Sequence, residues 1–480
     1  MKLYKYNSYY EVTDIQQNSP LFNKIDWTFS CFNFKTKTRY GRLYLNIGST
    51  VRIPSSVSEV FIKETLEMFP INKEFSITKQ DTFYNMINLP RSDLQERAIN
   101  FLCEEGNHKV LSLNTNAGKT YISINALSRI KSNAIILVDT LALGRQWQEE
   151  FKKHTDAKDV QLVDVSDIEN NAVEDANVFI ITEQSIGSLM LKDYHKIEEF
   201  IAEKQIGVKI FDESHARFHD LTRINCVFNT ARTIYLTATF DRSYTEVKQW
   251  KEIFSGVKKM VEKTEERYRE INLVRFKTGP NPTEFELKYV VGLRGASSIL
   301  WGKYLLWKED RLRRPLLSPV IDTLMIQYDI RPKKTKSLCI IVPMNEICDR
   351  LYAHFEEKGF SVGIYNSAEA KESTTKEIFN NQIILTNSSM FSKGIDIPNL
   401  KWLMNFTSVS SLISLEQVVG RLRGKESDKD NRIYIDCVDA SFGDAFIKQQ
   451  KTRKTYYKTI TTDLELLKEK NIFKTYSEEE

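Results

Sequence analysis

Three short segments of this 480-residue chain combine residue types and spacing that suit the chemistry of nucleotide phosphates. In the first, VLSLNTNAGKTYISINAL, an apolar strand leads into a tight loop that ends in Gly118, Lys119 and Thr120, and a helical stretch follows. The backbone N–H groups of such a loop, together with the N-terminus of the helix behind it, can bind phosphates. We expect Lys119 to reach the β- and γ-phosphates and Thr120 to ligate Mg²⁺.

This loop departs from the usual phosphate-binding pattern at two positions. Leu113 stands where the full pattern has a glycine, and Asn116 stands where many such loops have one. Asparagine tolerates left-handed backbone better than other non-glycine residues, so the loop can still form. A truncated motif can also arise by chance, so it needs support from elsewhere in the chain.

The second segment, VKIFDESHARF, is an apolar strand that ends in Asp212 and Glu213. We expect Asp212 to hold Mg²⁺, through water, and Glu213 to orient and deprotonate an attacking water molecule. The alternative is a strand that merely ends in an acidic turn. The 93 residues from Lys119 to Asp212 leave room for two further strand–helix units, and the sequence supplies them.

The third segment, QVVGRLRG, contains Gln417, Gly420, Arg421 and Arg423. Its arginines could act as fingers on the γ-phosphate of a nucleotide that another part of the chain holds. Taken alone, a run of this kind is more often a basic turn of a helix.

The elements that must position these segments follow a regular order. From residue 89 onward, short apolar runs alternate with amphipathic stretches, which predicts a parallel sheet with helices on both faces. The pattern lapses at 241–335, a charged region with few clear strands, and then returns. We therefore predict two α/β lobes: the first at 89–260, and the second, preceded by a bridging segment, at 261–480.

The pattern of apolar and polar residues in 1–88 differs from that of the rest of the chain. It predicts a small α+β accessory domain with a hairpin turn at KTKTRYG. The net charge of the chain is +4, and residues 1–50, with seven basic and three acidic side chains, hold an excess of the same size. Such a segment is a candidate nucleic-acid face, and an ordinary solvated surface is the alternative. The basic side chains at the predicted turn are Lys35, Lys37, Arg39 and Arg42.

Two further features of composition bear on function. In the bridging segment, Trp301, Tyr304 and Trp307 alternate with basic residues; docking on the second lobe is favoured over contact with nucleic acid, although the pattern allows both. The six cysteines are scattered without metal-site spacing, so we expect buried free thiols. We find no apolar stretch long enough for a membrane span and no secretory signal at the start.

The order of these segments and of their neighbours resembles superfamily 2 helicases over most of residues 89–440. LPRSDLQERAI resembles the segment that reads adenine, NTNAGKT resembles motif I, LVDTLALGRQW motif Ia and IITEQSI motif Ib. DESH resembles motif II, LTATF motif III, CIIVPMNE motif IV, ILTNSSMFSKGIDIP motif V and QVVGRLRG motif VI. The resemblance implies an α/β fold of two tandem RecA-like lobes with an ATP site between them, and the use of ATP and Mg²⁺.

The resemblance also implies roles for particular residues, Gln95 reading the adenine edge among them. Residues expected to act in hydrolysis are Lys119, Asp212, Glu213, Gln417, Arg421 and Arg423. Residues expected to bind the nucleotide are Arg91, Gln95, Asn116, Ala117, Gly118, Lys119, Thr120, Gly394 and Asp396. Residues expected to contact nucleic acid in the lobes are Thr140, Arg145, Gln146, Thr182, Gln184 and Thr386. Residues expected to couple the ATP site to the second lobe are His215, Thr237 and Thr239.

Motif VI departs from the family at one point: its second arginine follows the first by two residues, where three are usual, which leaves open which arginine is the finger. Within the superfamily, LALGRQW and the small N-terminal domain resemble phage UvsW-type, RecG-like and XPB-like DNA enzymes. This implies a monomeric phage or viral helicase or translocase, in the host cytoplasm, that remodels branched or forked DNA in recombination, repair or replication. A motor directed to RNA or linked to transcription remains the alternative.

Overall fold

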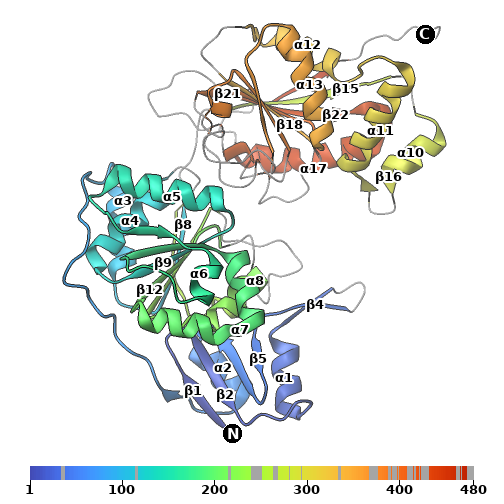
Figure 1. The fold of residues 1–480 in the computed structure, drawn as a ribbon. Helices are drawn as coiled ribbons and strands as arrows, with labels where there is room; N and C mark the ends of the chain where they lie inside the picture. The colour runs from blue at the N-terminus through green and yellow to red at the C-terminus, as the bar shows by residue number, and fades with distance from the viewer. Residues whose placement is uncertain are drawn as a thin grey trace. The chain divides into compact units, whose positions relative to one another are not determined.

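The structure of the protein is a computed structural model. It describes the chain apart from residues 34–37, 114–116, 215–217, 239–250, 263–268, 280–281, 293–294, 333–336, 367–376, 388–390, 392–396, 398, 408–414, 416–417, 421, 423–431, 461–464, 466 and 473–480. The chain divides into two compact units, Met1–Thr264 and Glu265–Glu480, each with its own sheet system. Figure 1 shows the elements of both.

The first unit is built on a parallel seven-stranded sheet in the order β10-β11-β9-β12-β13-β8-β14. Its strands are β8 (His108–Leu113), β9 (Ala134–Val138), β10 (Val160–Leu162), β11 (Val178–Thr182), β12 (Val208–Phe211), β13 (Arg232–Thr237) and β14 (Lys258–Glu262). Successive apolar residues of a strand point to opposite faces, so each strand serves two cores. In β9, Ile136 belongs to one buried cluster, and Ile135 and Leu137 belong to the other.

Helices cover both faces of this sheet (Figure 1). They are α3 (Asp93–Cys103), α4 (Lys119–Ile130), α5 (Leu141–His154), α6 (Val165–Glu169), α7 (Glu183–Glu203) and α8 (Phe218–Asn225). The first three pack in one cluster, and the last three pack in the other. This is the parallel sheet with helices on both faces that the alternating pattern predicts.

The N-terminal residues form a smaller five-stranded sheet in the order β5-β6-β2-β1-β7, with a separate hairpin. Its elements are β1 (Lys2–Lys5), β2 (Tyr9–Thr13), α1 (Pro20–Thr28), β3 (Ser30–Asn33), β4 (Thr38–Arg42), β5 (Leu45–Ile47), β6 (Thr50–Pro54), α2 (Glu59–Leu66) and β7 (Ile71–Asn72). The antiparallel pair β3–β4 is the predicted hairpin, and the basic side chains Lys35 and Lys37 at its turn lie outside the described residues.

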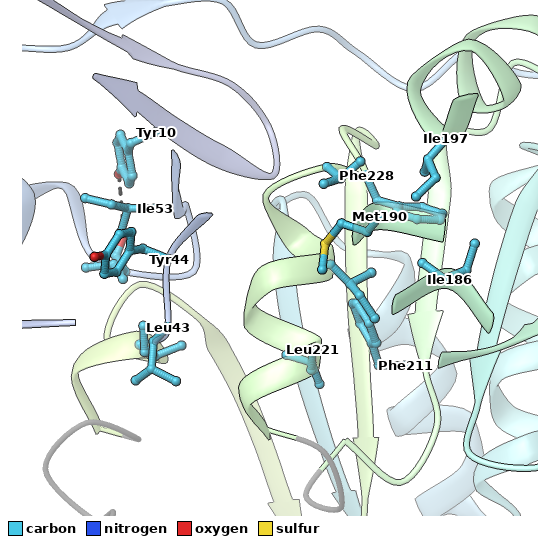
Figure 2. Packing of buried hydrophobic residues seen from close by; sticks show 14 of the residues in the cluster. Tyr10, Leu43, Tyr44, Ile53, Ile186, Met190, Ile197, Phe211, Leu221 and Phe228 are labelled. Atoms are coloured by element: carbon cyan, nitrogen blue, oxygen red, sulfur yellow. Dashed lines mark hydrogen bonds between the residues drawn. The ribbon is translucent and has the colours of Figure 1, made fainter. Parts of the chain in front are cut away.

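The small sheet and the first lobe share one hydrophobic core. Tyr10 and Ile53 of the small sheet belong to the same buried cluster as Phe211 and Leu221 of the lobe (Figure 2). The boundary expected at residue 88 therefore does not separate two compact units. An extended segment between the two also binds to the lobe: the Tyr84 hydroxyl donates to the carbonyl of Ile124 at 2.8 Å.

The second unit is also built on a parallel seven-stranded sheet, in the order β19-β20-β18-β21-β22-β15-β23. Its strands are β15 (Arg269–Phe276), β18 (Ser337–Val342), β19 (Val362–Tyr365), β20 (Ile383–Asn387), β21 (Leu400–Asn405), β22 (Arg432–Asp439) and β23 (Leu467–Ile472). A small pair, β16 (Val291–Gly292) and β17 (Gly295–Ala296), lies outside this sheet. The helices of the second unit are α10 (Glu284–Val290), α11 (Ser298–Leu312), α12 (Ser318–Gln327), α13 (Asn345–Glu357), η1 (Ala440–Phe442) and α17 (Asp444–Ile460).

The region 241–335, expected to be a bridge with few strands, contributes to both sheets, and that expectation was wrong. Strand β14 pairs with β8, and β15 lies between β22 and β23. Helix α11 docks on the second lobe, as the sequence favours: Trp301 and Tyr304 are buried in the lobe's core, whereas Trp307 is 48% exposed. Two of the three aromatic residues, Trp301 and Tyr304, therefore contribute to packing of the core.

The six cysteines are free thiols, and all except the half-buried Cys103 are buried, as expected. Among the residues that the structure describes, no group of three or more His, Cys, Asp or Glu side chains is placed to hold a metal ion. No helix in the described part of the chain is both long and apolar enough to cross a membrane.

Candidate nucleotide-binding site

The predicted phosphate loop joins β8 to α4, and its last residues are in place. Gly118 is the N-cap of α4 and has φ +86°, a left-handed conformation that favours glycine. A Cβ at Gly118 would lie 2.5 Å from Gln95 Nε2, so no larger residue fits without movement. The N-cap residue is a glycine and has no side chain that could accept the first N–H groups of α4. The N-terminus of a helix is a favourable place for an anion such as a phosphate.

Lys119 is the first residue of α4 and is only 9% exposed. Its Nζ donates to the carbonyl of Leu113 at the end of β8, 3.1 Å away. Thr120 follows and is half-buried, and Ala117 precedes the cap. The side chain of Lys119 therefore turns back over the loop, which is the place where it would meet a phosphate.

Gln95 lies in the first turn of α3 and supports the loop directly. Its Oε1 accepts the backbone N–H of Arg91 at 2.9 Å, and its Nε2 donates to the carbonyl of Ala117 at 3.2 Å. Gln95 is 3% exposed, whereas Arg91 is exposed. Both ends of the Gln95 amide are thus oriented by the backbone beside the loop. This arrangement brings the segment expected to read adenine next to the phosphate loop.

Asp212 follows β12 directly and is 7% exposed. Its Oδ1 accepts the backbone N–H of Glu213 at 2.9 Å, and its Oδ2 accepts the indole N–H of Trp147 at 2.8 Å. Burial raises the pKa of Asp212 and the charge of Glu213 raises it further, whereas the Trp147 hydrogen bond and the positive charge of Lys119 lower it. Strands β8 and β12 run parallel in one sheet, so the phosphate loop after β8 and Asp212 after β12 lie at the same edge of that sheet.

The residues present fit a nucleotide with Mg²⁺. The loop offers the N-terminus of α4 and the ammonium group of Lys119 for phosphate oxygens. Asp212 and Thr120 offer hard oxygen donors, the kind that Mg²⁺ prefers. Glu213 has φ +50°, a left-handed conformation uncommon for glutamate. Such an outlier at the end of a buried strand is typical of a functional site.

Trp147 is a residue that the sequence reasoning missed. It lies on α5, it is fully buried, and its indole N–H binds the carboxylate of Asp212. The motif Ia run ends in this tryptophan, but apolar spacing on a helix points first to a core residue. Only the three-dimensional approach of α5 to the end of β12 reveals the hydrogen bond.

The residues of the first lobe that are expected to contact nucleic acid lie at or near the starts of helices. The hydroxyls of Thr140 and Thr182 cap α5 and α7, because they accept the N–H groups of Leu143 and Ser185 at 3.2 Å each. These two threonines therefore have a structural task in the fold. On the same helices, Arg145 is half-buried, and Gln146 and Gln184 are exposed at the surface.

Thr386, which is expected to contact nucleic acid in the second lobe, is not at the surface. It is 1% exposed, and its hydroxyl donates to the carbonyl of Tyr365 at 2.9 Å. The hydroxyl joins β20 to its neighbour β19, and a nucleic-acid contact at Thr386 stays a prediction. Thr237 is also fully buried, at the end of β13, where it pairs in register with Ser112 of β8.

Several expected site residues lie outside the described part of the chain, so their roles stay predictions. They are Asn116, His215, Thr239, Gly394, Asp396, Gln417, Arg421 and Arg423, besides Lys35 and Lys37 of the hairpin turn. The other two hairpin cations are described, and both pair with Asp26: Arg39 through Nη1, and Arg42 through Nε at 3.4 Å. Part of the basic excess is therefore neutralised locally.

Comparisons with known proteins agree with this geometry. The family described as Type III restriction enzyme, res subunit, matches residues 88–242, and the helicase conserved C-terminal domain matches residues 320–424. In fold, the chain is similar to S. cerevisiae Dbp5 bound to RNA and ADP BeF3, with TM-score 0.51 and 16% identity over 79% of this chain and 90% of that one. It is similar to Mss116p bound to ssRNA and AMP-PNP, with TM-score 0.51 and 15% identity over 81% of this chain and 75% of that one.

Among curated proteins, L396 of Acanthamoeba polyphaga mimivirus, provisionally named an ATP-dependent RNA helicase, is 24% identical over 86% of this chain and 76% of its own length. A Haloarcula marismortui protein, provisionally named the DNA 3'-5' helicase Rad25, is 25% identical over 39% of this chain and 30% of its own length. The DNA 3'-5' helicase XPB of Kineococcus radiotolerans is 28% identical over 28% of this chain and 24% of its own length.

The two parallel-sheet units are tandem RecA-like lobes, and the fold, the phosphate loop and the matched domains define one class of protein. The chain belongs to helicase superfamily 2.

Proposed function

We propose that the chain is an ATP-driven helicase or translocase that acts on DNA and remodels branched or forked substrates. The observation that carries the ATPase part is the placement of Gly118 and Lys119 after β8 and of Asp212 after β12, two parallel strands of the sheet of the first lobe. The XPB and Rad25 similarities support DNA as the substrate.

In this proposal, residues of the first lobe bind and orient the nucleotide. Lys119 neutralises charge on the transferring phosphate. Thr120, and Asp212 through water, would hold Mg²⁺, which would supply positive charge to the phosphates. Glu213 takes the proton of the attacking water. Gln95 reads the adenine while it holds the loop at Ala117.

The second lobe has a part in the same proposal. Either Arg421 or Arg423 supplies the finger that stabilises charge on the γ-phosphate, and Gln417 of the same motif acts with it. His215, Thr237 and Thr239 couple the nucleotide state to the second lobe. Gly394 and Asp396 complete the nucleotide contacts from motif V.

RNA is the second candidate substrate, and one observation favours it. The mimivirus protein with the RNA helicase name aligns with 86% of this chain, whereas the two DNA helicases align with 39% and 28%. A role in recombination, repair or replication, a phage or viral origin, a monomeric state and a place in the host cytoplasm belong to the DNA proposal.

The test is ATP hydrolysis measured with single-stranded DNA, duplex DNA, forked DNA, Holliday junctions and RNA. The proposal expects strong stimulation by forked or branched DNA and weak stimulation by RNA of the same length. Lys119→Ala should abolish turnover. Arg129→Ala is the matched control, because Arg129 lies on the same helix in an exposed ion pair with Glu96, 2.9 Å away, and should keep the wild-type rate. Stimulation by RNA alone would overturn the DNA assignment, and unchanged turnover in Lys119→Ala would overturn the ATPase assignment.

A further inference from the structure

A hydrogen bond joins helix α5 to the carboxylate that follows β12. Trp147 Nε1 donates to Asp212 Oδ2 at 2.8 Å, and the two side chains are 0% and 7% exposed. The bond spans 65 residues of sequence and connects two different strand–helix units of the lobe. Because both groups are buried, the removal of either partner leaves the other without this hydrogen bond at a cost in free energy.

The packing of α5 fixes where the indole can lie. A Cβ at Gly144, one helical turn before Trp147, would lie 2.8 Å from Leu162 Cδ1 and 3.3 Å from Ile180 Cγ2. The helix therefore approaches the sheet as closely as a glycine allows. One turn further on, the ring of Phe151 packs beside the indole, with centroids 6.4 Å apart. The donor is thus held by the core and not by a mobile surface helix.

The Asp212 carboxylate is held at both of its oxygens. Trp147 donates to Oδ2, and the backbone N–H of Glu213 donates to Oδ1 at 2.9 Å. Two donors on opposite oxygens fix the plane of the carboxylate, and both bonds favour its charged form. The lone pairs that remain on the two oxygens are the ones available to a cation or to its water ligands.

Trp147 also follows directly after two residues expected to contact nucleic acid. Arg145 is half-buried and Gln146 is exposed, and both lie on the same turn of α5 as Trp147. Nucleic acid bound at Arg145 or Gln146 would therefore contact the same helical turn that carries the donor of the Asp212 hydrogen bond.

We propose that Trp147 is a positioning residue: its indole N–H holds the Asp212 carboxylate in the orientation that Mg²⁺–ATP requires and links α5 to the nucleotide site. The inference rests on the proposed function as an ATP-driven motor. It concerns binding of the metal–nucleotide complex before hydrolysis, so it has a readout other than turnover.

The experiment compares affinity for a non-hydrolysable ATP analogue with Mg²⁺ and with EDTA, measured by calorimetry. In Trp147→Phe, the gain in affinity on adding Mg²⁺ should fall about tenfold, as expected when one hydrogen bond to a charged group is removed, and the affinity in EDTA should stay at the wild-type value. Phe151→Leu is the matched control, since it removes volume from the same core without touching the hydrogen bond.

A second variant separates the hydrogen bond from the ring volume. Benzothienylalanine placed at position 147 has a sulfur in place of the indole N–H and keeps the shape of tryptophan. It should reproduce the tenfold reduction of the Mg²⁺ effect and reduce the stimulation of ATP hydrolysis by nucleic acid. A wild-type Mg²⁺ effect in this variant, or an equal drop in affinity with Mg²⁺ and with EDTA, overturns the positioning role.

The failure of this inference can be told from the failure of the proposed function. If Asp212→Asn removes the Mg²⁺ effect while the variants at Trp147 keep it, only the positioning role is wrong. If the wild-type protein binds no nucleotide under either condition, the proposed function fails, and the role of Trp147 fails with it.

Discussion

The ammonium group of Lys209 lies 3.1 Å from the hydroxyl oxygen of Ser8, in a buried hydrogen bond between the first lobe and the N-terminal sheet. Lys209 also donates to the carbonyl of Phe228 at 2.5 Å, and it stands three residues before Asp212 on β12. Burial lowers its pKa well below the ordinary value for lysine. Strand β12, which leads into Asp212 and Glu213 at one end, therefore contacts the N-terminal residues through Lys209 near its other end.

This contact predicts that the N-terminal sheet stabilises the motor lobe. Ile53→Ala, within the shared core, should lower the free energy of unfolding of the first unit by roughly 2–5 kcal/mol, because it leaves a cavity. Val60→Ala, at a side chain that is 65% exposed, should change it by less than about 0.5 kcal/mol. Denaturant unfolding of both variants measures the difference. A first lobe that folds and hydrolyses ATP without residues 1–66 would contradict this prediction.

The burial of His108 at the contact between the N-terminal sheet and the first lobe predicts how the stability of the first unit depends on pH. Its Nε2 lies 3.0 Å from the carbonyl of Asn7 and 2.8 Å from the hydroxyl of Ser55, inside the junction. Burial is the main cause that lowers the pKa of His108 to about 3, and the charge of Lys209 adds to it. The histidine is therefore neutral in the folded protein at pH values where the unfolded chain already binds a proton.

The sign follows from proton linkage. Between the ordinary histidine pKa near 6.5 and the folded value near 3, the unfolded state binds more protons, so stability falls as the pH falls. The decrease should approach about 1.4 kcal/mol per pH unit from this one group. Thermal or urea unfolding from pH 7 to pH 4 measures it. His108→Gln should flatten the dependence, whereas His195→Gln, whose side chain is 64% exposed, should leave it unchanged. Equal slopes in wild type and His108→Gln would show that other groups dominate.

Glu213→Gln tests the expected base. The variant should bind the non-hydrolysable ATP analogue with wild-type affinity but hydrolyse ATP about 10²–10⁴-fold more slowly, because an amide cannot accept the proton of the water. Single-turnover hydrolysis separates this step from product release. A variant that loses nucleotide affinity but turns over bound ATP normally would assign Glu213 to binding instead.

Much of the fold and of the first-lobe site could be predicted from the sequence because both depend on local patterns. The apolar run of β8 followed by Gly118 and Lys119 predicted the strand and the helix correctly, and the run VKIF placed Asp212 at a strand end. The strand β15 was missed because REINLVRF carries charges at both of its ends, although the sheet buries its centre.

Other features required the three-dimensional structure because they depend on residues far apart in the chain. The Trp147–Asp212 hydrogen bond spans 65 residues, and the Lys209–Ser8 bond spans 201. The sequence pattern of residues 1–88 indicates a separate domain. It does not show that the apolar face of this domain packs against the first lobe. Thr386 matched its motif by sequence, but its hydroxyl is used within the sheet.

The hairpin β3–β4 is a candidate contact for nucleic acid. Arg39 and Arg42 both pair with Asp26, which also accepts the hydroxyl of Tyr44 at 2.5 Å. If these arginines bind phosphates, Asp26 competes with the nucleic acid for them. Asp26→Asn should then tighten binding to forked DNA, since an asparagine oxygen can still accept from Tyr44 but carries no charge.

Arg39→Ala combined with Arg42→Ala should have the opposite effect. It should weaken binding and reduce the slope of log affinity against log salt by close to one unit for each phosphate that the protein no longer binds. Fluorescence anisotropy with forked DNA over a range of salt concentrations measures both variants. Lys24→Ala is the control, because Lys24 is paired with Glu67 at 3.0 Å on the same small domain. If neither the Asp26 variant nor the double arginine variant changes affinity or salt slope, the hairpin is an ordinary solvated surface, and nucleic acid is bound by other parts of the protein.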